Sequence, residues 1–190
     1  MSHLRTRRIV RDMGLIPSDS AARASARVRW AMLGIAVLVV TADQVSKSLI
    51  LASRATAAGS GWIMVQLVRN TGASGGFASD YPVLVTLAGL LIAAGAITFT
   101  LRVRGRVTAL CLAAACGGAI GNLSDRLLRS PGSGRGAVVD WIHVAGRGGS
   151  FNVADLAIQL GALGAVIAMF AAERATRQRR PARERVDEGG

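Results

Sequence analysis

The residues of this chain best suited to chemistry are two aspartates, each preceded by apolar or capping residues. Asp140 follows Val138 and Val139, and Asp155 comes three positions after Asn152 at the start of an apolar run. If the two aspartates meet, they would share one proton, because neighbouring like charges do not both ionise easily. One carboxylate can then act as a general base on water while its protonated partner polarises a carbonyl. This pattern indicates acid–base hydrolysis.

Other hydrolytic or metal-dependent chemistry lacks the residues that it needs. His3 lies in a polar terminal segment, and His143 has no second member of a triad. Cys111 and Cys116 stand five positions apart in one apolar segment, where they point to different helical faces and are expected to be small core residues. Since no Cys/His cluster is present, the sequence predicts no metal site.

Further polar side chains accompany the two aspartates, and each has a structural alternative. Asp43 and Lys47 are four residues apart on one helical face, so they predict an ion pair that would make a polar helix tolerable in lipid. Asn122 and Asp125 are three apart and share a face, which lets both point into a helix bundle. Asn152 is expected to cap the helix that follows it, to line a site, or to do both.

Four long apolar segments must position these residues. A helix needs about 20 apolar residues to cross the hydrocarbon core, and 51% of the 190 residues are hydrophobic. A stretch rich in strand formers, residues 62–68, lies between the first two segments and predicts a short strand outside the bilayer. Gly117, Gly118 and Gly121 predict the close approach of a neighbouring helix. The predicted spans are residues 30–51, 82–101, 107–123 and 153–172.

Arginines are distributed unevenly around these segments. Seven precede the first, three lie in the turn between the second and third, and six follow the fourth, whereas the two longer loops hold fewer per residue. By the positive-inside rule, both termini and the short turn then face the cytoplasm. By contrast, Asp43, Lys47, Asn122, Asp125, Asp140, Asn152 and Asp155 all fall toward the outer side. We therefore expect an all-α membrane protein with four transmembrane helices and a small extracytoplasmic β or loop region.

The length of the chain and its charge distribution predict the domain boundaries and the class of partner. The chain fits one domain: residues 30–172 are predicted to form it, between a largely disordered basic cytoplasmic tail at 1–29 and a charged cytoplasmic tail at 173–190. A net charge of +12 could indicate nucleic acid. The basic residues flank apolar spans instead of forming a face on a polar domain, so no nucleic-acid partner is expected.

Five short motifs resemble those of lipoprotein signal peptidase, also called signal peptidase II, a family of intramembrane aspartic proteases. They run in the family's order across residues 30–172. NTGA or VVDW alone would be a weak signal, but all five at compatible positions between four spans are specific. The motifs are DQxxK at 43–47, NTGA at 70–73, GGAxGNxxDR at 117–126, VVDW at 138–141 and FNxAD at 151–155.

The resemblance implies an activity and roles for the motif residues. The family removes signal peptides from bacterial prolipoproteins, cleaving before a cysteine that carries diacylglycerol, and it needs no metal or cofactor. The implied partners are this substrate and the lipids of the cytoplasmic membrane, with the active site toward the outer face. Asp140 and Asp155 would be the catalytic dyad. The implied substrate-binding or dyad-supporting residues are Asn70, Gly72, Asn122, Arg126 and Asn152, and the implied structural polar residues are Asp43, Lys47 and Asp125.

A small four-span proton-coupled transporter is the alternative from another functional class. A proton relay requires acids distributed through the bilayer, with access from both sides. The cytoplasmic halves of all four predicted spans lack acids, which disfavours a transporter.

Overall fold

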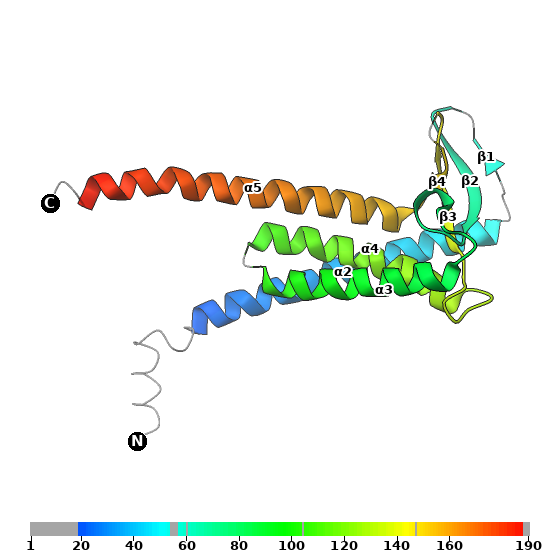
Figure 1. Ribbon diagram of the computed structural model, residues 1–190, viewed down its shortest axis with the longest axis horizontal. Helices are drawn as coiled ribbons and strands as arrows, with labels where there is room; N and C mark the ends of the chain where they lie inside the picture. The colour runs from blue at the N-terminus through cyan, green and yellow to red at the C-terminus, as the bar shows by residue number, and fades with distance from the viewer. Residues whose placement is uncertain (1–18, 54–56, 60, 104, 147, 188–190) are drawn as a thin grey trace, which may run out of the picture.

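The computed structural model describes residues 19–53, 57–59, 61–103, 105–146 and 148–187. Four long helices make up most of the molecule, and a small sheet stands at one end of them (Figure 1). The helices are α2 (Asp19–Ser53), α3 (Pro82–Arg102), α4 (Arg106–Leu128) and α5 (Val153–Asp187). All four are long and apolar enough to cross a membrane, so the predicted all-α membrane architecture with a small β region is confirmed.

The ends of the helices differ from the predicted spans. Helix α2 begins at Asp19, so residues 19–29, predicted to be disordered, are helical. The reason is local, because this stretch is rich in alanine and arginine and holds no glycine or proline, a composition that favours helix. Residues 1–18 of the predicted tail lie outside the described residues. Helix α5 continues to Asp187, through most of the predicted C-terminal tail.

Four antiparallel strands form the sheet in the order β1-β2-β3-β4. They are β1 (Ala57–Ala58), β2 (Ile63–Asn70), β3 (Val138–Val144) and β4 (Ser150–Phe151). The strand predicted at residues 62–68 is thus confirmed as β2. Its partner β3 comes from the loop between α4 and α5, and in this register Val68 stands opposite Asp140. A short 3-10 helix, η1 (Ser74–Gly76), follows β2.

Helix α4 packs against each of the other three long helices. Its glycines allow this close approach, as predicted. A Cβ added at Gly117 would lie 2.8 Å from the backbone oxygen of Ala36 on α2, and one added at Gly118 would collide with the backbone oxygen of Ala154 on α5. Large apolar side chains elsewhere point outward, among them Leu91 at 76% exposure. In a bilayer, small interface residues and outward apolar side chains are the expected arrangement.

Candidate active site

A cavity of about 380 Å³ at the sheet end of the bundle is bordered by both motif aspartates. Its walls come from the end of β2, from η1, α4, β3 and β4, and from the first turns of α5. The fold therefore gathers residues from positions 70 to 159 around one space. Five of the predicted site residues line it: Asn70, Asn122, Arg126, Asp140 and Asp155.

Asp140 lies on β3 and is 3% exposed. Two side-chain amides donate to it, Asn70 Nδ2 to Oδ2 at 3.1 Å and Asn152 Nδ2 to Oδ1 at 2.6 Å. Burial and the nearby charge of Asp155 raise the pKa of Asp140 to about 6, against the opposing effect of the two amides. Asp140 therefore keeps its proton to a higher pH than an aspartate ordinarily does.

Asp155 occupies the third position of α5 and forms a reciprocal cap with Asn152. The backbone N–H of Asp155 donates to Asn152 Oδ1 at 3.0 Å, and the backbone N–H of Asn152 donates to Asp155 Oδ2 at 3.2 Å. This is the geometry of a capping box. The other carboxylate oxygen of Asp155 accepts a 2.8 Å bond from Asn122 Nδ2. Both carboxylate oxygens of Asp155 therefore accept N–H bonds at the start of α5.

Asn152 connects the two aspartates. It is fully buried, and its Nδ2 donates to Asp140 while its backbone and Oδ1 hold Asp155. The same Nδ2 also lies 3.1 Å from Asn122 Oδ1. Asn152 thus caps α5, one of the two roles that the sequence left open, and its side chain also contacts Asp140. Asp140 and Asp155 border the cavity from different elements, β3 and α5.

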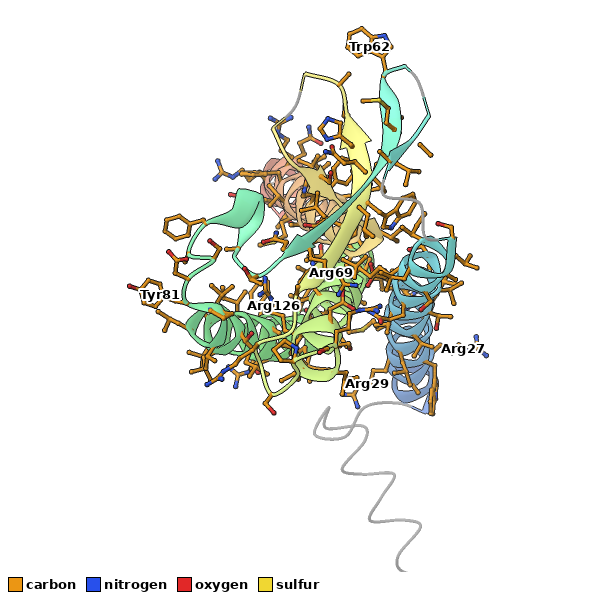
Figure 2. All side chains as sticks on the ribbon, turned by 90° about the vertical axis from the view of Figure 1, so that its right-hand side faces the viewer. Arg27, Arg29, Trp62, Arg69, Tyr81 and Arg126 are labelled. Atoms are coloured by element: carbon orange, nitrogen blue, oxygen red, sulfur yellow. The ribbon has the colours of Figure 1, made fainter. Side chains whose placement is uncertain are left out.

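Arg126 borders the cavity and holds the turn that follows β2. Its guanidinium donates to the backbone oxygens of Thr71, at 3.0 Å, and Gly72. Figure 2, which views this end of the molecule, shows Arg126 between α4 and that turn. Gly72 is required there, because an added Cβ would lie 2.5 Å from the backbone oxygen of Phe77. Gly72 also donates its N–H to Asn70 Oδ1 at 3.0 Å, so Gly72 supports the wall without lining the cavity.

The three predicted structural polar residues form one buried ionic cluster beside the cavity. The predicted ion pair is present, with Lys47 Nζ 2.8 Å from Asp43 Oδ2. Lys47 also lies 2.8 Å from Asp125 Oδ2. All three side chains are fully buried. None of them lines the cavity.

Sequence reasoning missed two members of this cluster and one wall of the cavity. Gln44 Nε2 donates to Asp125 Oδ1 at 3.1 Å, and Arg129 Nε lies 2.6 Å from the same oxygen. The spacing of four between Asp125 and Arg129 could have predicted their pair. Residues 148 to 151, which include Gly148, Gly149 and Ser150, also line the cavity, and nothing in their uncharged sequence signals it.

Among the residues that the structure describes, no group of three or more His, Cys, Asp or Glu side chains could hold a metal ion. The cavity instead offers two carboxyl groups in different environments, the amides of Asn70, Asn122 and Gln159, and one guanidinium. Two carboxyl groups at one cavity, one of them with a raised pKa, are the elements of acid–base hydrolysis.

Comparisons with known proteins agree with this chemistry. Residues 35–171 match the sequence model of a family described as Signal peptidase (SPase) II. The chain is 34% identical over 167 residues to a lipoprotein signal peptidase from Streptomyces griseus, covering 83% of each chain. It is 35% identical over 156 residues to one from Mycobacterium leprae, covering 78% of this chain and 77% of the other. A solved structure described as a bacterial membrane enzyme superposes with a TM-score of 0.65 at 25% identity, over 74% of this chain and 87% of that one.

Proposed function

The chain belongs to the signal peptidase II family, and we propose that Asp140 and Asp155 are the catalytic dyad with which it removes signal peptides from prolipoproteins. The chain is an aspartic endopeptidase and a multi-pass membrane protein. The alternative of a proton-coupled transporter is not supported, because the matching family and relatives are peptidases. One observation carries the assignment of the dyad: two carboxyl groups from separate elements, β3 and α5, border one cavity and are joined through Asn152.

The two aspartates have distinct roles in this proposal. Asp155, which accepts two N–H bonds at a helix N-terminus, is the general base that takes a proton from water as its oxygen attacks the scissile carbonyl carbon. Asp140, whose pKa is raised to about 6, gives its proton to the carbonyl oxygen. When the carbon–nitrogen bond of the tetrahedral intermediate breaks, the proton held by Asp155 passes to the leaving amine and the hydroxyl proton returns to Asp140. The pair is then ready for another cycle.

The proposed substrate carries diacylglycerol on the cysteine after the scissile bond. Support comes from the lining of the cavity, which includes Ile158 and Gln159 of α5. Ile158 is about 4.5 Å further along the helix axis than Asp155, and helix faces beyond it are apolar and exposed, as at Leu160 and Leu163. Acyl chains could therefore remain in lipid while the peptide bond enters the cavity.

We further propose that the dyad faces the outer side of the cytoplasmic membrane, with both termini in the cytoplasm. The uneven arginines support this orientation. Reporter fusions after Arg104 and Arg180 should report cytoplasm, and fusions near Ser60 and Gly134 should report the outside. A cytoplasmic signal near Gly134 would put the cavity on the wrong side and would refute the orientation.

Cleavage by the purified protein in detergent tests the function directly. The protein should convert a diacylated prolipoprotein into a product that begins with the modified cysteine, which mass spectrometry of both fragments identifies. The same prolipoprotein without diacylglycerol is the matched control and should remain largely intact. Equal cleavage of both forms would remove diacylglycerol from the proposed recognition, and cleavage of neither by folded protein would refute the proposal.

A further inference from the structure

Lys47 of α2 is fully buried and meets three acceptors on two different helices. Its Nζ lies 2.8 Å from Asp43 Oδ2, 2.8 Å from Asp125 Oδ2 and 3.0 Å from Asn122 Oδ1. An ammonium group has three N–H donors, so these contacts use all of them. The lysine therefore ties α2 to α4 at one fixed point beside the cavity.

Each of the two carboxylates bound by Lys47 also holds the backbone next to a different catalytic aspartate. Asp43 Oδ1 accepts the backbone N–H of Ala154 at 3.0 Å, and Ala154 immediately precedes Asp155. Asp125 Oδ2 accepts the backbone N–H of Val139 at 3.2 Å, and Val139 immediately precedes Asp140. Ala154 opens α5, whereas Val139 lies on β3.

A third connection from Lys47 reaches the dyad through a side chain. Asn122 Oδ1 accepts from Lys47, which leaves its Nδ2 to donate to Asp155 Oδ1 at 2.8 Å. A cation at Oδ1 favours this orientation of the amide, because only the oxygen end of an amide accepts a bond from an ammonium group. Lys47 thus fixes which atom of Asn122 faces the proposed base.

We propose that Asp43, Lys47 and Asp125 form a charged clamp that sets the separation between Asp140 and Asp155, with Lys47 as its positioning residue. This inference rests on the proposed function, since it assigns the clamp a task in the reaction of that dyad. β3 and α5 are already linked through the β3–β4 pairing and through Asn152. The clamp adds a direct link between their backbones beside the two aspartates, through two carboxylates that share a single cation.

Charge neutralisation alone does not account for this geometry. Buried ion pairs commonly contribute little net stability, and apolar replacements of similar volume are often as stable or more so. A pair that only cancels charge needs no contact with the backbone beside both catalytic residues. The carboxylate of Asp43 also fits only beside a glycine, because a Cβ added at Gly121 would lie 2.7 Å from Asp43 Oδ2.

Changing the length of the clamp while keeping its charges separates positioning from neutralisation. Asp125→Glu keeps every charge but lengthens one arm by one methylene, about 1.5 Å. A misplacement of about 1 Å at a reacting centre can cost about 100-fold. We therefore expect kcat per folded molecule to fall about 100-fold, with KM changed by less than about threefold.

A transition-state mimic provides the second readout. A diacylated peptide with a hydroxyethylene group in place of the scissile amide should lose affinity for Asp125→Glu in proportion to kcat, because catalysis depends on binding of the transition state. The matched control is Glu173→Asp. Glu173 forms an exposed ion pair of the same i,i+4 spacing with Arg177, at 2.6 Å, and its change of length should leave kcat unaltered.

Removing the charges of the clamp, instead of changing its length, is a second test of its positioning role. The triple variant Asp43→Asn/Lys47→Met/Asp125→Asn leaves no buried charge unpaired in the cluster, and Arg129, at 22% exposure, can turn to solvent. It should unfold within a few degrees of the wild type in detergent and still show kcat reduced about 100-fold.

Either of two results would overturn the clamp: Asp125→Glu with wild-type kcat, or a folded triple variant with kcat within about threefold of the wild type. Both results require a wild-type protein that cleaves the substrate. A wild type that does not cleave would instead refute the proposed function, so the two failures are distinguishable.

Discussion

The two ends of the helix bundle are built on different principles. At the sheet end, five charged side chains and an amide are buried together, and partners from α2, α4, β3 and α5 satisfy them. These residues are Asp43, Lys47, Asp125, Arg126, Asp140 and Asn152. At the other end, near the turn between α3 and α4, the buried polar residues among those described are Thr100 and Thr108. Exposed arginines at this end include Arg29, Arg102, Arg106, Arg174 and Arg177.

This difference shows where the fold needs an exact arrangement. Burying a charge is costly unless partners surround it, so the sheet end requires several elements to meet with correct hydrogen bonds. The other end needs only helices that fit together and apolar side chains that face lipid. Substitutions should therefore impair chemistry at one end and leave it unchanged at the other.

The largest effect is expected from the dyad. Asp140→Asn and Asp155→Asn keep the size of each side chain but cannot cycle a proton, so each should lower the cleavage rate by about 10⁴-fold or more. The double variant should be scarcely slower, because residues that act as a unit are not additive. The measurement is cleavage of the diacylated substrate per folded molecule.

Asp80→Asn is the matched control for the dyad, because Asp80 is exposed and lies outside every motif. It should retain full activity. Substantial turnover by either dyad variant would end the assignment of these two aspartates.

Alanine substitutions at two tightly packed glycines should separate a loss of stability from a loss of activity. A Cβ at Gly121 would lie 2.7 Å from Asp43 Oδ2, and one at Gly161 would lie 2.6 Å from the backbone oxygen of Cys111. Overpacking should cost both alanine variants about 1–3 kcal/mol of unfolding free energy. Only Gly121→Ala should also reduce cleavage per folded molecule, by roughly tenfold, because it displaces a clamp carboxylate.

Gly95→Ala serves as the uncrowded control, since an added Cβ there meets nothing within 4 Å. Thermal unfolding in detergent, combined with kcat, separates the three cases. An equal loss of activity in Gly121→Ala and Gly161→Ala would contradict the claim that only packing beside the clamp affects catalysis.

The pH dependence should report the raised pKa of Asp140. Burial and the charge of Asp155 favour the protonated form, so Asp140 holds its proton up to a pH of about 6. If Asp140 is the acid, kcat/KM should fall about tenfold for each pH unit above that value, because kcat/KM follows the ionisation of the free enzyme. A flat profile from pH 5 to 9 would contradict this role.

The same shift has a consequence for stability. The folded protein binds this proton more tightly than the unfolded chain, whose pKa is near 3.8. The stabilising contribution is therefore complete below that pH and is lost as the pH rises through about 6. Asp140→Asn should remove this part of the pH dependence of thermal unfolding, whereas Asp80→Asn should leave it in place.

The smallest effect is expected at the end away from the sheet. Arg174→Gln changes one exposed side chain and should alter the unfolding free energy by less than about 0.5 kcal/mol. Cleavage per inserted molecule should stay within about twofold, because five other arginines of the C-terminal segment still favour its orientation. A large loss of activity in inserted, folded protein would reveal a function at that end.

Most elements could be predicted because their signals are local. The spans follow from runs of apolar residues, β2 from its strand formers, and the Asp43–Lys47 pair from a spacing of four. The start of α2 at Asp19 differs from the disordered segment that the basic charge predicts, because helix propensity prevails over charge repulsion in residues 19–29. The contact of Gln44 with Asp125 could not be predicted because 81 residues separate them, whereas the spacing of four between Asp125 and Arg129 does indicate their pair.

The sequence by itself determined the four spans, their arginine asymmetry and the residue types available for acid–base chemistry, because each depends on composition or short spacing. Only the tertiary structure decided that Asp43 and Asp125 hold the backbone beside Asp155 and Asp140, over separations of 111 and 14 residues. It also decided that Asn152 touches both aspartates and that burial raises the pKa of Asp140. Hydrogen bonds and desolvation act over a few ångströms of space, so they depend on which elements meet rather than on distance along the chain.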